Sequence, residues 1–506
     1  MAGLRGMEPL RLLAAASPIL LIAALVIFLS MSTLGLSLWG ILLTAVIACL
    51  VFHTSITTVL LAALDGCITT VPLVLIVFFG IMLSIVLIRT GALSRIVTGL
   101  LGGFRHPMHQ VGAICFGIEN FVAGAGIITE PIIAPTLKAA GLPGKSAAIL
   151  AIWGYAGIMS FSLAGVFVLV LSLVTGLDLK TLAITSAFLS LVPTLICGIL
   201  LHLFVEKRDS AKTFVPFNAC AALACGALVL FFSAYVSSST AGMLAGIAVL
   251  AGILLVSRAT PSLNALALAD GVPFLILIVA LMAANLYAPL HTLVGEKLVF
   301  SLSVLPIHKV TIRPLLDAYT YLVVAIAVSL FLFKIGQVEL YDIVRSTVRA
   351  ASKPIAAMMV FGAMGQIITF TGYKDATHAI SRGDNIPYVL ASGLSAMSGR
   401  SYPIFAPMLG WMGTFLTGYG SLSIMIFGKL QVEIAQFLHV SPEILASAMM
   451  VGSGIGSISS PFKIAIAASL VDAVGKEGEI LKKTIPLGIA ISLVTGLWAY
   501  LVMHFQ

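Results

Sequence analysis

Charged residues are scarce in this chain of 506 residues. Asp, Glu, Lys and Arg together make up 9% of the sequence and hydrophobic residues 60%, and the mean hydropathy is +1.15. A water-soluble protein of this length needs far more charge to cover its surface. The composition therefore excludes a soluble fold and indicates a protein that lies in a lipid bilayer.

The sequence motifs of several other functions are missing as well. The six cysteines form no CxxC pair, and no HExxH places two histidines on one helix face, so the sequence predicts no metal site. No glycine-rich phosphate loop is present, which disfavours an ATP-driven pump. Basic and aromatic residues do not alternate outside the apolar runs, which argues against a nucleic-acid partner. We therefore predict a membrane protein without a cofactor.

Apolar runs long enough to cross about 30 Å of hydrocarbon recur along the whole chain, and they predict about 12 transmembrane helices. The first run lacks the small-residue cleavage site of a secretory signal, so we expect it to be retained. The uninterrupted spans are expected at residues 10–30, 34–52, 71–88, 180–204, 217–236, 241–256, 273–287, 319–333, 354–371 and 484–504.

The net charge of +8 comes largely from basic residues in four connections between spans, at 89–105, 207–212, 345–353 and 476–483. Loops rich in Lys and Arg are typically cytoplasmic. The side of the N-terminus stays open at this point. Three plain spans before the first basic loop would place the N-terminus outside the cell. Arg5 and Arg11 favour the inside, which requires that residues 54–70 enter the membrane and return on the same side.

Two further apolar stretches are interrupted by Gly, Pro and Ser, and they share two motifs in the same order. An FxxGxG pattern at 121–126 returns at 415–420, an offset of 294 residues (415 − 121). A GIxSxS pattern at 157–162 returns at 454–459, an offset of 297 residues (454 − 157). A duplicated pair of broken segments is typical of transporters built from internal repeats.

The expected fold is an all-α polytopic membrane protein in two repeat-related halves, each with broken or re-entrant helical segments. Five segments are expected: N-terminal spans with a basic loop (1–109), the first broken-helix repeat (110–178), connecting spans (179–401), the second broken-helix repeat (402–476) and a last span (477–506).

A substrate site is predicted where the two broken stretches meet. Repeat transporters bind substrate near the membrane midplane, where helices break and expose N–H groups of positive partial charge. Glycine permits such breaks and serine adds hydroxyl groups. Small residues at these spacings also serve helix packing, which is the alternative explanation for any one of them. The predicted site residues are Gly124, Gly126, Ser160, Ser162, Gly418, Gly420, Ser457, Ser459, Ser460 and Lys463.

Charged residues inside apolar segments are costly and usually functional. Lys463 is predicted to balance the charge of an anionic substrate. Glu119, which precedes the first break, is the candidate for taking up a coupling proton. The alternative is a buried ion pair between Glu119 and Lys463 without a role in transport. Glu130 is a third charge of this kind, next to Pro131.

Segments in both halves resemble the L-lactate permease family. The run FAPMLGWMGTFLTG (405–418), followed by SPFKIAIAASLVDAVGKE (460–477), is similar to the C-terminal signature of that family. The segment CFGIENFVAGAG (115–126) is similar to its upstream glycine-rich motif. The resemblance implies a secondary carrier of the bacterial plasma membrane that takes up lactate and related 2-hydroxy monocarboxylates with protons. It also implies inverted repeats with re-entrant hairpins.

The polar positions depart from the pattern of the family that the chain resembles. Asn120 and Phe121 stand where members have Glu-Gly, and residues 419–424 lack the usual acid and amide. The segment Trp-Gly-Tyr (153–155) replaces an Asn-Thr pair that is expected near Gly154, and Lys463 lies at a position that is usually neutral. The scaffold is therefore expected to match the family, while the substrate can differ from lactate.

The sequence as a whole predicts a multi-pass secondary transporter of the bacterial inner membrane. Its expected partners are the lipid bilayer, a small organic anion such as lactate or glycolate, a coupling proton and, as one oligomeric option, a second copy of the chain. One alternative is another carboxylate or a sulfonate coupled to Na+. A channel is disfavoured because it needs no duplicated site. An intramembrane enzyme with a Ser nucleophile needs a general base, and no His lies in either break.

Overall fold

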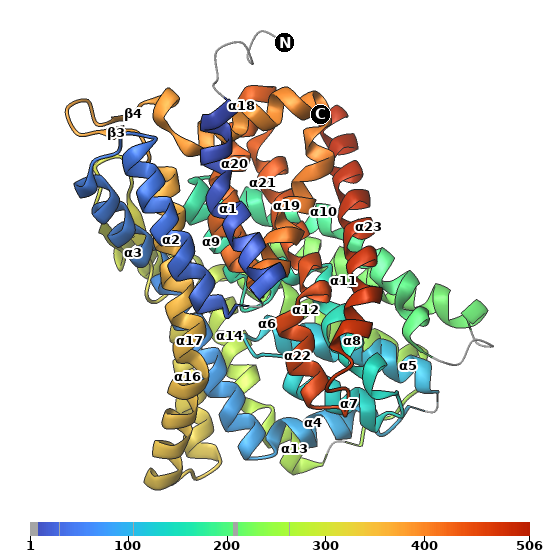
Figure 1. Ribbon diagram of the computed structural model, residues 1–506. Coiled ribbons are helices and arrows are strands. Elements are labelled where there is room, and N and C mark those ends of the chain that lie inside the picture. The colour runs from blue at the N-terminus through green and yellow to red at the C-terminus, as the bar shows by residue number, and fades with distance from the viewer. Residues whose placement is uncertain (1–8, 30, 105, 206–210, 263, 506) are drawn as a thin grey trace.

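The computed structural model describes residues 9–29, 31–104, 106–205, 211–262 and 264–505, and these residues form a bundle of helices (Figure 1). Within this part of the chain, nine helices are long and apolar enough to cross a membrane, and a bent pair raises the number to ten. Four shorter apolar helices accompany them. The predicted polytopic helical fold is confirmed.

Three helices precede the first basic loop: α1 (Pro9–Leu29), α2 (Thr33–Leu50) and α3 (Ile56–Arg89). Helix α3 is continuous over 34 residues, so the option that residues 54–70 form a separate re-entrant segment is wrong. Helix α3 packs along α17 (Gln337–Thr369), and a Cβ at Gly66 would lie 2.3 Å from the carbonyl oxygen of Gly362. Backbone contact through small residues joins the two helices, as is common in membranes.

The first repeat consists of a broken helix, a helical hairpin and a second broken segment. The helix α5 (Pro107–Gly112) continues through a π-helical turn, η2 (Ala113–Ile118), into α6 (Glu119–Gly124) and ends at the first break. The hairpin is α7 (Glu130–Ala139) with α8 (Gly144–Ala156). A 3-10 turn, η3 (Met159–Phe161), then leads to α9 (Val166–Thr175).

The second repeat has the same order of parts. Helix α19 (Tyr402–Thr417) ends at a break, and α20 (Gly420–Leu438) and α21 (Pro442–Gly456) form the hairpin. A 3-10 turn, η9 (Ser457–Ser459), leads to α22 (Pro461–Ser469), which is bent by 42° from α21. The GIxSxS motif thus interrupts the helix in both halves, as predicted.

The two hairpins enter the molecule from opposite ends (Figure 1). The turn between α7 and α8 lies beside the turn between α22 and α23 (Glu477–His504), and the ion pairs Lys138–Asp472 and Lys145–Glu479 join these two turns. The turn between α20 and α21 lies at the other end, with the start of α1 and the end of α23. The repeats therefore have inverted orientations.

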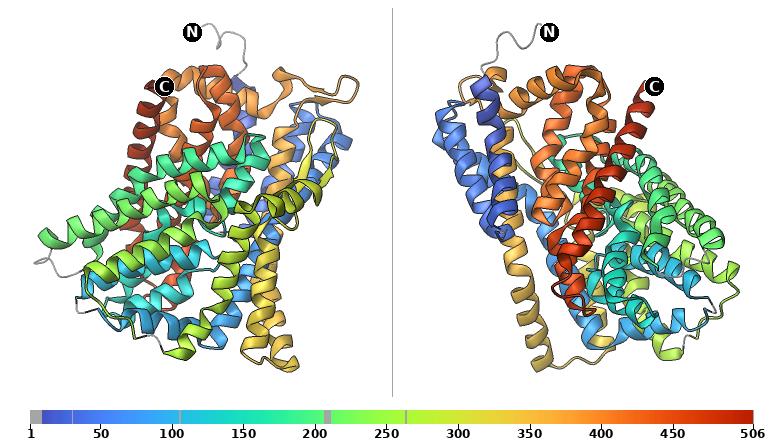
Figure 2. Two further views of the ribbon diagram at one scale, coloured as in Figure 1. Left: turned by 180° about the vertical axis from the view of Figure 1, so that it is seen from behind. Right: turned by 45° about the vertical axis from the view of Figure 1, so that its right-hand side comes forward.

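The remaining elements surround the repeats. Helices α10 (Leu179–Leu200), α11 (Ala211–Tyr235) and α12 (Ser238–Val256) cover the side that faces the viewer in the left view of Figure 2. Two small antiparallel hairpins, which the sequence did not predict, are the strands of the described residues. The other elements are α4 (Ala92–Leu101), η4 (Leu201–Phe204), α13 (Ala265–Asp270), α14 (Val272–Leu286), α15 (Ala288–Thr292), η6 (Leu293–Lys297), β1 (Phe300–Leu302), β2 (Val310–Ile312), α16 (Ala318–Leu332), β3 (Tyr373–Lys374), β4 (Ala379–Ile380), η7 (Arg382–Asp384), α18 (Ile386–Ser398) and η8 (Gly399–Ser401).

Two of the four predicted basic connections lie at one end of the molecule. The connections after α3 and α22 are at the end opposite the start of α1 (Figure 1). The basic residues at 345–353 lie inside α17, so the prediction of a connection there is wrong. Residues 206–210, which include most of the remaining basic connection, lie outside the described residues. A common end for these basic loops is the arrangement that the positive-inside rule requires.

Candidate functional site

The structure brings the GIxSxS breaks of the two repeats into direct contact. The Ser457 hydroxyl lies 2.7 Å from the sulfur atom of Met159. A Cβ at Gly454 would lie 2.8 Å from the carbonyl oxygen of Ala156, and a Cβ at Gly420 would lie 3.2 Å from Cε of Met159. Residues almost 300 positions apart in the sequence thus form one junction inside the bundle.

The four glycines of the FxxGxG motifs have different structural roles. Gly126 (φ +88°) and Gly418 (φ +83°) adopt left-handed backbone conformations at the ends of α6 and α19, which other residues adopt only with strain. Gly124 packs against α12, where a Cβ would lie 2.4 Å from the amide nitrogen of Met243. Gly420 starts α20 at the junction. In the first motif the left-handed glycine is the second one, Gly126, whereas in the second motif it is the first one, Gly418.

The serines of the two breaks also differ in what they contact. Ser459 accepts a hydrogen bond from Trp411 Nε1 (3.2 Å) and donates one to the carbonyl of Thr484 (2.9 Å), so it ties the break to α23. Ser460 caps the first turn of α22. Ser160 and Ser162 are buried, and among the described residues the hydroxyl of Ser160 has no hydrogen-bond partner. Ser160 therefore has an unused polar group beside the junction.

A chain of polar side chains links the two repeats. Lys463 Nζ donates a hydrogen bond to the Tyr155 hydroxyl (2.7 Å), and this hydroxyl donates to Glu130 Oε1 (3.0 Å). Lys463 Nζ also lies 3.9 Å from Glu130 Oε1, and the Lys463 side chain is 12% exposed. The ion pair of Lys463 is therefore with Glu130, and the alternative of a Glu119–Lys463 pair is wrong.

Glu119 lies near this chain of side chains but is not part of it. Its side chain is fully buried, and a Cβ at Gly154 would lie 2.4 Å from Glu119 Oε2. Within the described part of the molecule, neither carboxyl oxygen has a hydrogen-bond partner of normal geometry. The neighbouring Asn120 donates to the carbonyls of Cys115 (3.1 Å) and Phe116 (3.3 Å) in the π-helical turn. Asn120 thus fixes the backbone from which Glu119 projects.

Tyr155 and Glu130 were not among the predicted site residues. Each had a signal in the sequence, because Glu130 is an acid inside an apolar segment and Tyr155 stands at a position that departs from the family pattern. Tyr155 contacts Lys463, which is another departure from that pattern, through the 2.7 Å hydrogen bond.

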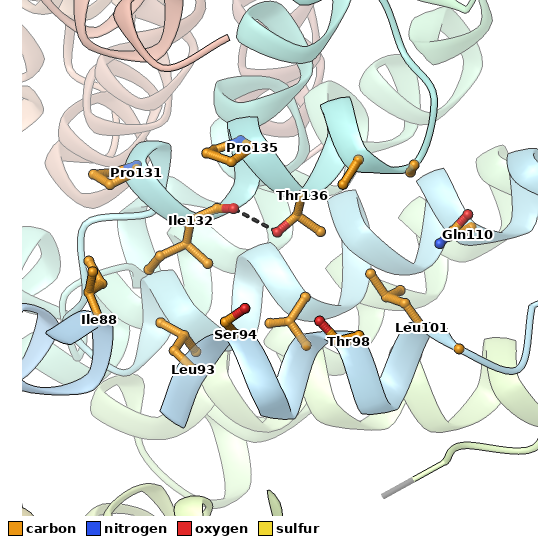
Figure 3. A pocket seen from close by; sticks show the side chains of 14 residues that line it. Ile88, Leu93, Ser94, Thr98, Leu101, Gln110, Pro131, Ile132, Pro135 and Thr136 are labelled. Carbon is orange, nitrogen blue, oxygen red and sulfur yellow. Dashed lines mark hydrogen bonds between the residues drawn. The ribbon is translucent and has the colours of Figure 1, made fainter. Parts of the chain in front are cut away.

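Two cavities lie beside the breaks. One, of about 620 Å³, adjoins the second break and is lined by Gly418, Tyr419 and Phe462 among others. The other, of about 470 Å³, separates α4 from α7 (Figure 3). Ser94 and Thr98 face Ile132 and Thr136 across it, and Thr136 uses its hydroxyl to bond the Ile132 carbonyl. Helix α7, which begins at Glu130, therefore has free space on one side.

The described residues contain no group of three or more His, Cys, Asp or Glu side chains that could hold a metal ion. The titratable groups at the junction are instead one lysine, two glutamates and a tyrosine. Such a set can bind a small anion through charge and hydrogen bonds, and it can exchange protons.

Comparisons with known proteins show which sequences are similar to this chain. The sequence profile described as L-lactate permease matches residues 11–264 and 248–506. The L-lactate permease of Streptococcus iniae is 24% identical over 427 residues, which cover 81% of this chain and 87% of the relative. The solved YdaH transporter of Alcanivorax borkumensis shares 15% identity at a TM-score of 0.44, over 88% of this chain and 87% of that one.

Other relatives match over shorter segments. The glycolate permease GlcA of Escherichia coli is 27% identical over 184 residues, 36% of this chain and 30% of the relative. The L-lactate permease of Salmonella typhimurium is 33% identical over 165 residues, 32% of this chain and 30% of the relative. The chain thus aligns with less than a third of the length of these two relatives. Because the family profile covers nearly the whole sequence, this multi-pass membrane protein belongs to the L-lactate permease family.

Proposed function

We propose that this protein carries a small 2-hydroxy monocarboxylate, such as lactate or glycolate, together with a proton across the bacterial plasma (inner) membrane. The observation that carries the proposal is the largely buried lysine at the junction of two inverted breaks, Lys463, in a chain of the L-lactate permease family. A cation in such a place is costly unless an anion or a functional cycle compensates it.

The proposed anion site lies around Lys463. The carboxylate group of the substrate takes the Lys463 ammonium group as its counter-charge. The free Ser160 hydroxyl is a hydrogen-bond donor for the carboxylate or the 2-hydroxy group, and the Tyr155 hydroxyl can donate to the substrate in place of Glu130. The glycines and serines of both motifs remain part of this proposal: Gly124, Gly126, Ser162, Gly418, Gly420, Ser457, Ser459 and Ser460 shape the breaks that hold the junction.

The charges of the junction support coupling to a proton. Glu119 and Glu130 carry −2 when both are ionised and Lys463 carries +1, so the formal charge is −1 (−2 + 1). A monocarboxylate would bring it to −2 in a region with little water, which is unfavourable. Uptake of one proton by a carboxyl group keeps the charge constant. Glu119 is the proposed carrier of that proton because Tyr155 and Lys463 already hold Glu130.

Transport also requires that the junction open to each side in turn. A transporter built from inverted repeats can adopt two related conformations. In one conformation the first hairpin opens the site to its side of the membrane, and in the other the second hairpin opens the site to the opposite side. In this proposal the α7–α8 and α20–α21 hairpins alternate in that role.

Counterflow in proteoliposomes tests the proposal. Liposomes that contain the purified protein are loaded with unlabelled lactate and diluted into labelled lactate in a buffer without Na+. A carrier accumulates label transiently, and an acidic exterior drives net uptake. Protein-free liposomes are the control. Absence of counterflow with lactate, glycolate and longer 2-hydroxy acids would refute the substrate class, and a requirement for Na+ would refute the proton.

A further inference from the structure

The 620 Å³ cavity beside the second break is separate from the buried Lys463–Tyr155–Glu130 chain. It lies between the start of α2, the middle of α17, the end of α19 and the starts of α22 and α23. Tyr419 and Phe462 line it, and their ring centroids are 5.3 Å apart. Lys463 follows Phe462 in the chain but turns its ammonium group to Tyr155. The aromatic pair thus adjoins both the cavity and, through the chain at Phe462, the buried Lys463.

One charged side chain lines this cavity in the described residues, and it is Lys353 of α17. No carboxylate of the described chain forms an ion pair with it. The Ser32 hydroxyl adds a donor to the lining, because it accepts from the Gly35 amide and donates to no described residue, and Leu34 and Phe415 give the cavity an apolar wall. A cation without an ion-pair partner, a hydroxyl donor and an apolar wall are together the complement of a short-chain hydroxy acid anion.

We propose that this cavity is a second substrate site, in which Lys353 holds the carboxylate of the 2-hydroxy acid before it passes Tyr419 and Phe462 to Lys463. The inference rests on the proposed function, because it takes the same anion as its ligand. The volume is within the range that accommodates much larger ligands than a three-carbon acid. The cavity therefore admits longer 2-hydroxy acids, and the aromatic pair is the point at which size is selected.

A pair of charge-neutralising variants in α17 tests the site. Lys353→Gln removes the cation that lines the cavity, and Arg349→Gln removes a cation one turn away that does not line it; both side chains are exposed. The proposal predicts that Lys353→Gln raises KM for lactate about three- to fivefold, the range of a partly solvated charge pair, with a smaller effect on the maximal rate. Arg349→Gln should leave KM within error. Equal effects of both variants would show general electrostatic attraction instead and would overturn the site.

Restoration of the charge separates a local role from loss of fold. Lys353→Cys should raise KM as Lys353→Gln does. Reaction of that cysteine with a cationic methanethiosulfonate should return KM toward the wild-type value, whereas an anionic reagent should raise it further. Wild-type protein treated with the same reagents is the control for the native cysteines. KM that does not depend on the sign of the attached charge would contradict the proposal.

The two hypotheses fail in different ways. If the wild-type protein shows no counterflow of any 2-hydroxy acid, the proposed function is wrong. If the wild type transports lactate and Lys353→Gln has the wild-type KM, only the cavity site is wrong.

Discussion

Among single residues, Lys463 is the side chain on which the proposed transport depends most, because the fold places this lysine among buried groups. Lys463 contacts Glu130 at the start of α7 and Tyr155 near the end of α8, which are the two ends of the α7–α8 hairpin away from its turn. A charged hydrogen bond that is shielded from water is worth more than the same contact at a surface. The junction is therefore held by a few strong contacts, and a substrate anion that competes for Lys463 can loosen them.

Replacement of Lys463 should separate its role from that of an ordinary ion pair. Lys463→Gln removes a charged hydrogen bond worth about 1.5–3 kcal/mol, so lactate affinity should fall roughly 10- to 150-fold. Lys138→Gln breaks the exposed pair with Asp472 and should change affinity less than twofold. Ligand-dependent thermal shifts of the purified variants measure both effects. Unchanged affinity in Lys463→Gln would remove this residue from the site.

Part of this site could be predicted from the sequence. Glu119 and Lys463 stand out because charges are rare inside apolar segments. The partner of Lys463 could not be predicted, because Tyr155 lies 308 residues away in the chain and only the inverted packing of the repeats joins them. Glu130 was recognised as an intramembrane charge, but its pairing with Lys463 likewise depends on the fold.

At the scale of the element, breaks in helices are the features that distinguish this chain from a plain bundle. Both FxxGxG motifs end a helix, and both GIxSxS motifs contain a 3-10 turn. The sequence predicted these breaks because the motifs recur. The predicted span at 354–371 covers only the C-terminal half of α17, because the N-terminal half is polar and is typical of a loop. Helix α18 was not predicted. Helix packing rather than hydropathy stabilises such segments.

The left-handed glycine at the end of α19 gives a test of the second break. Ala at Gly418 costs about 1–2 kcal/mol of backbone strain, and its Cβ would also lie 3.1 Å from Cβ of Phe462. Gly141 is a matched control, because it has φ +92° and no atom within 4 Å of the added Cβ. Both variants should lower Tm, but only Gly418→Ala should also reduce transport. Equal transport by the two variants would contradict a role for this break.

At the scale of the whole molecule, the inverted repeats place corresponding parts on opposite sides of the membrane. The turn at Gly141 and the turn at His439 are both exposed, and they lie at opposite ends of the bundle (Figure 1). The basic connections lie at the end of the Gly141 turn. The positive-inside rule then predicts that this turn is cytoplasmic and that the start of α1 lies on the outside.

Labelling of single cysteines tests this arrangement. In a variant without the six native cysteines, Gly141→Cys should react with an impermeant maleimide in inside-out vesicles and His439→Cys in right-side-out vesicles. A double reaction from one side would show that the hairpins do not have opposite orientations. A complete exchange of the two results would retain the repeats and reverse the orientation of the protein.

The central claim is that the anion and a proton occupy the junction together. Calorimetric titration of the purified protein with lactate in buffers of different ionisation enthalpy measures the protons taken up per anion bound. The account predicts about one proton for the wild type, since the charge of the site stays constant, and close to none for Glu119→Gln, which is neutral from the start. Lactate binding without proton uptake by the wild type, or the same uptake by Glu119→Gln, would contradict it.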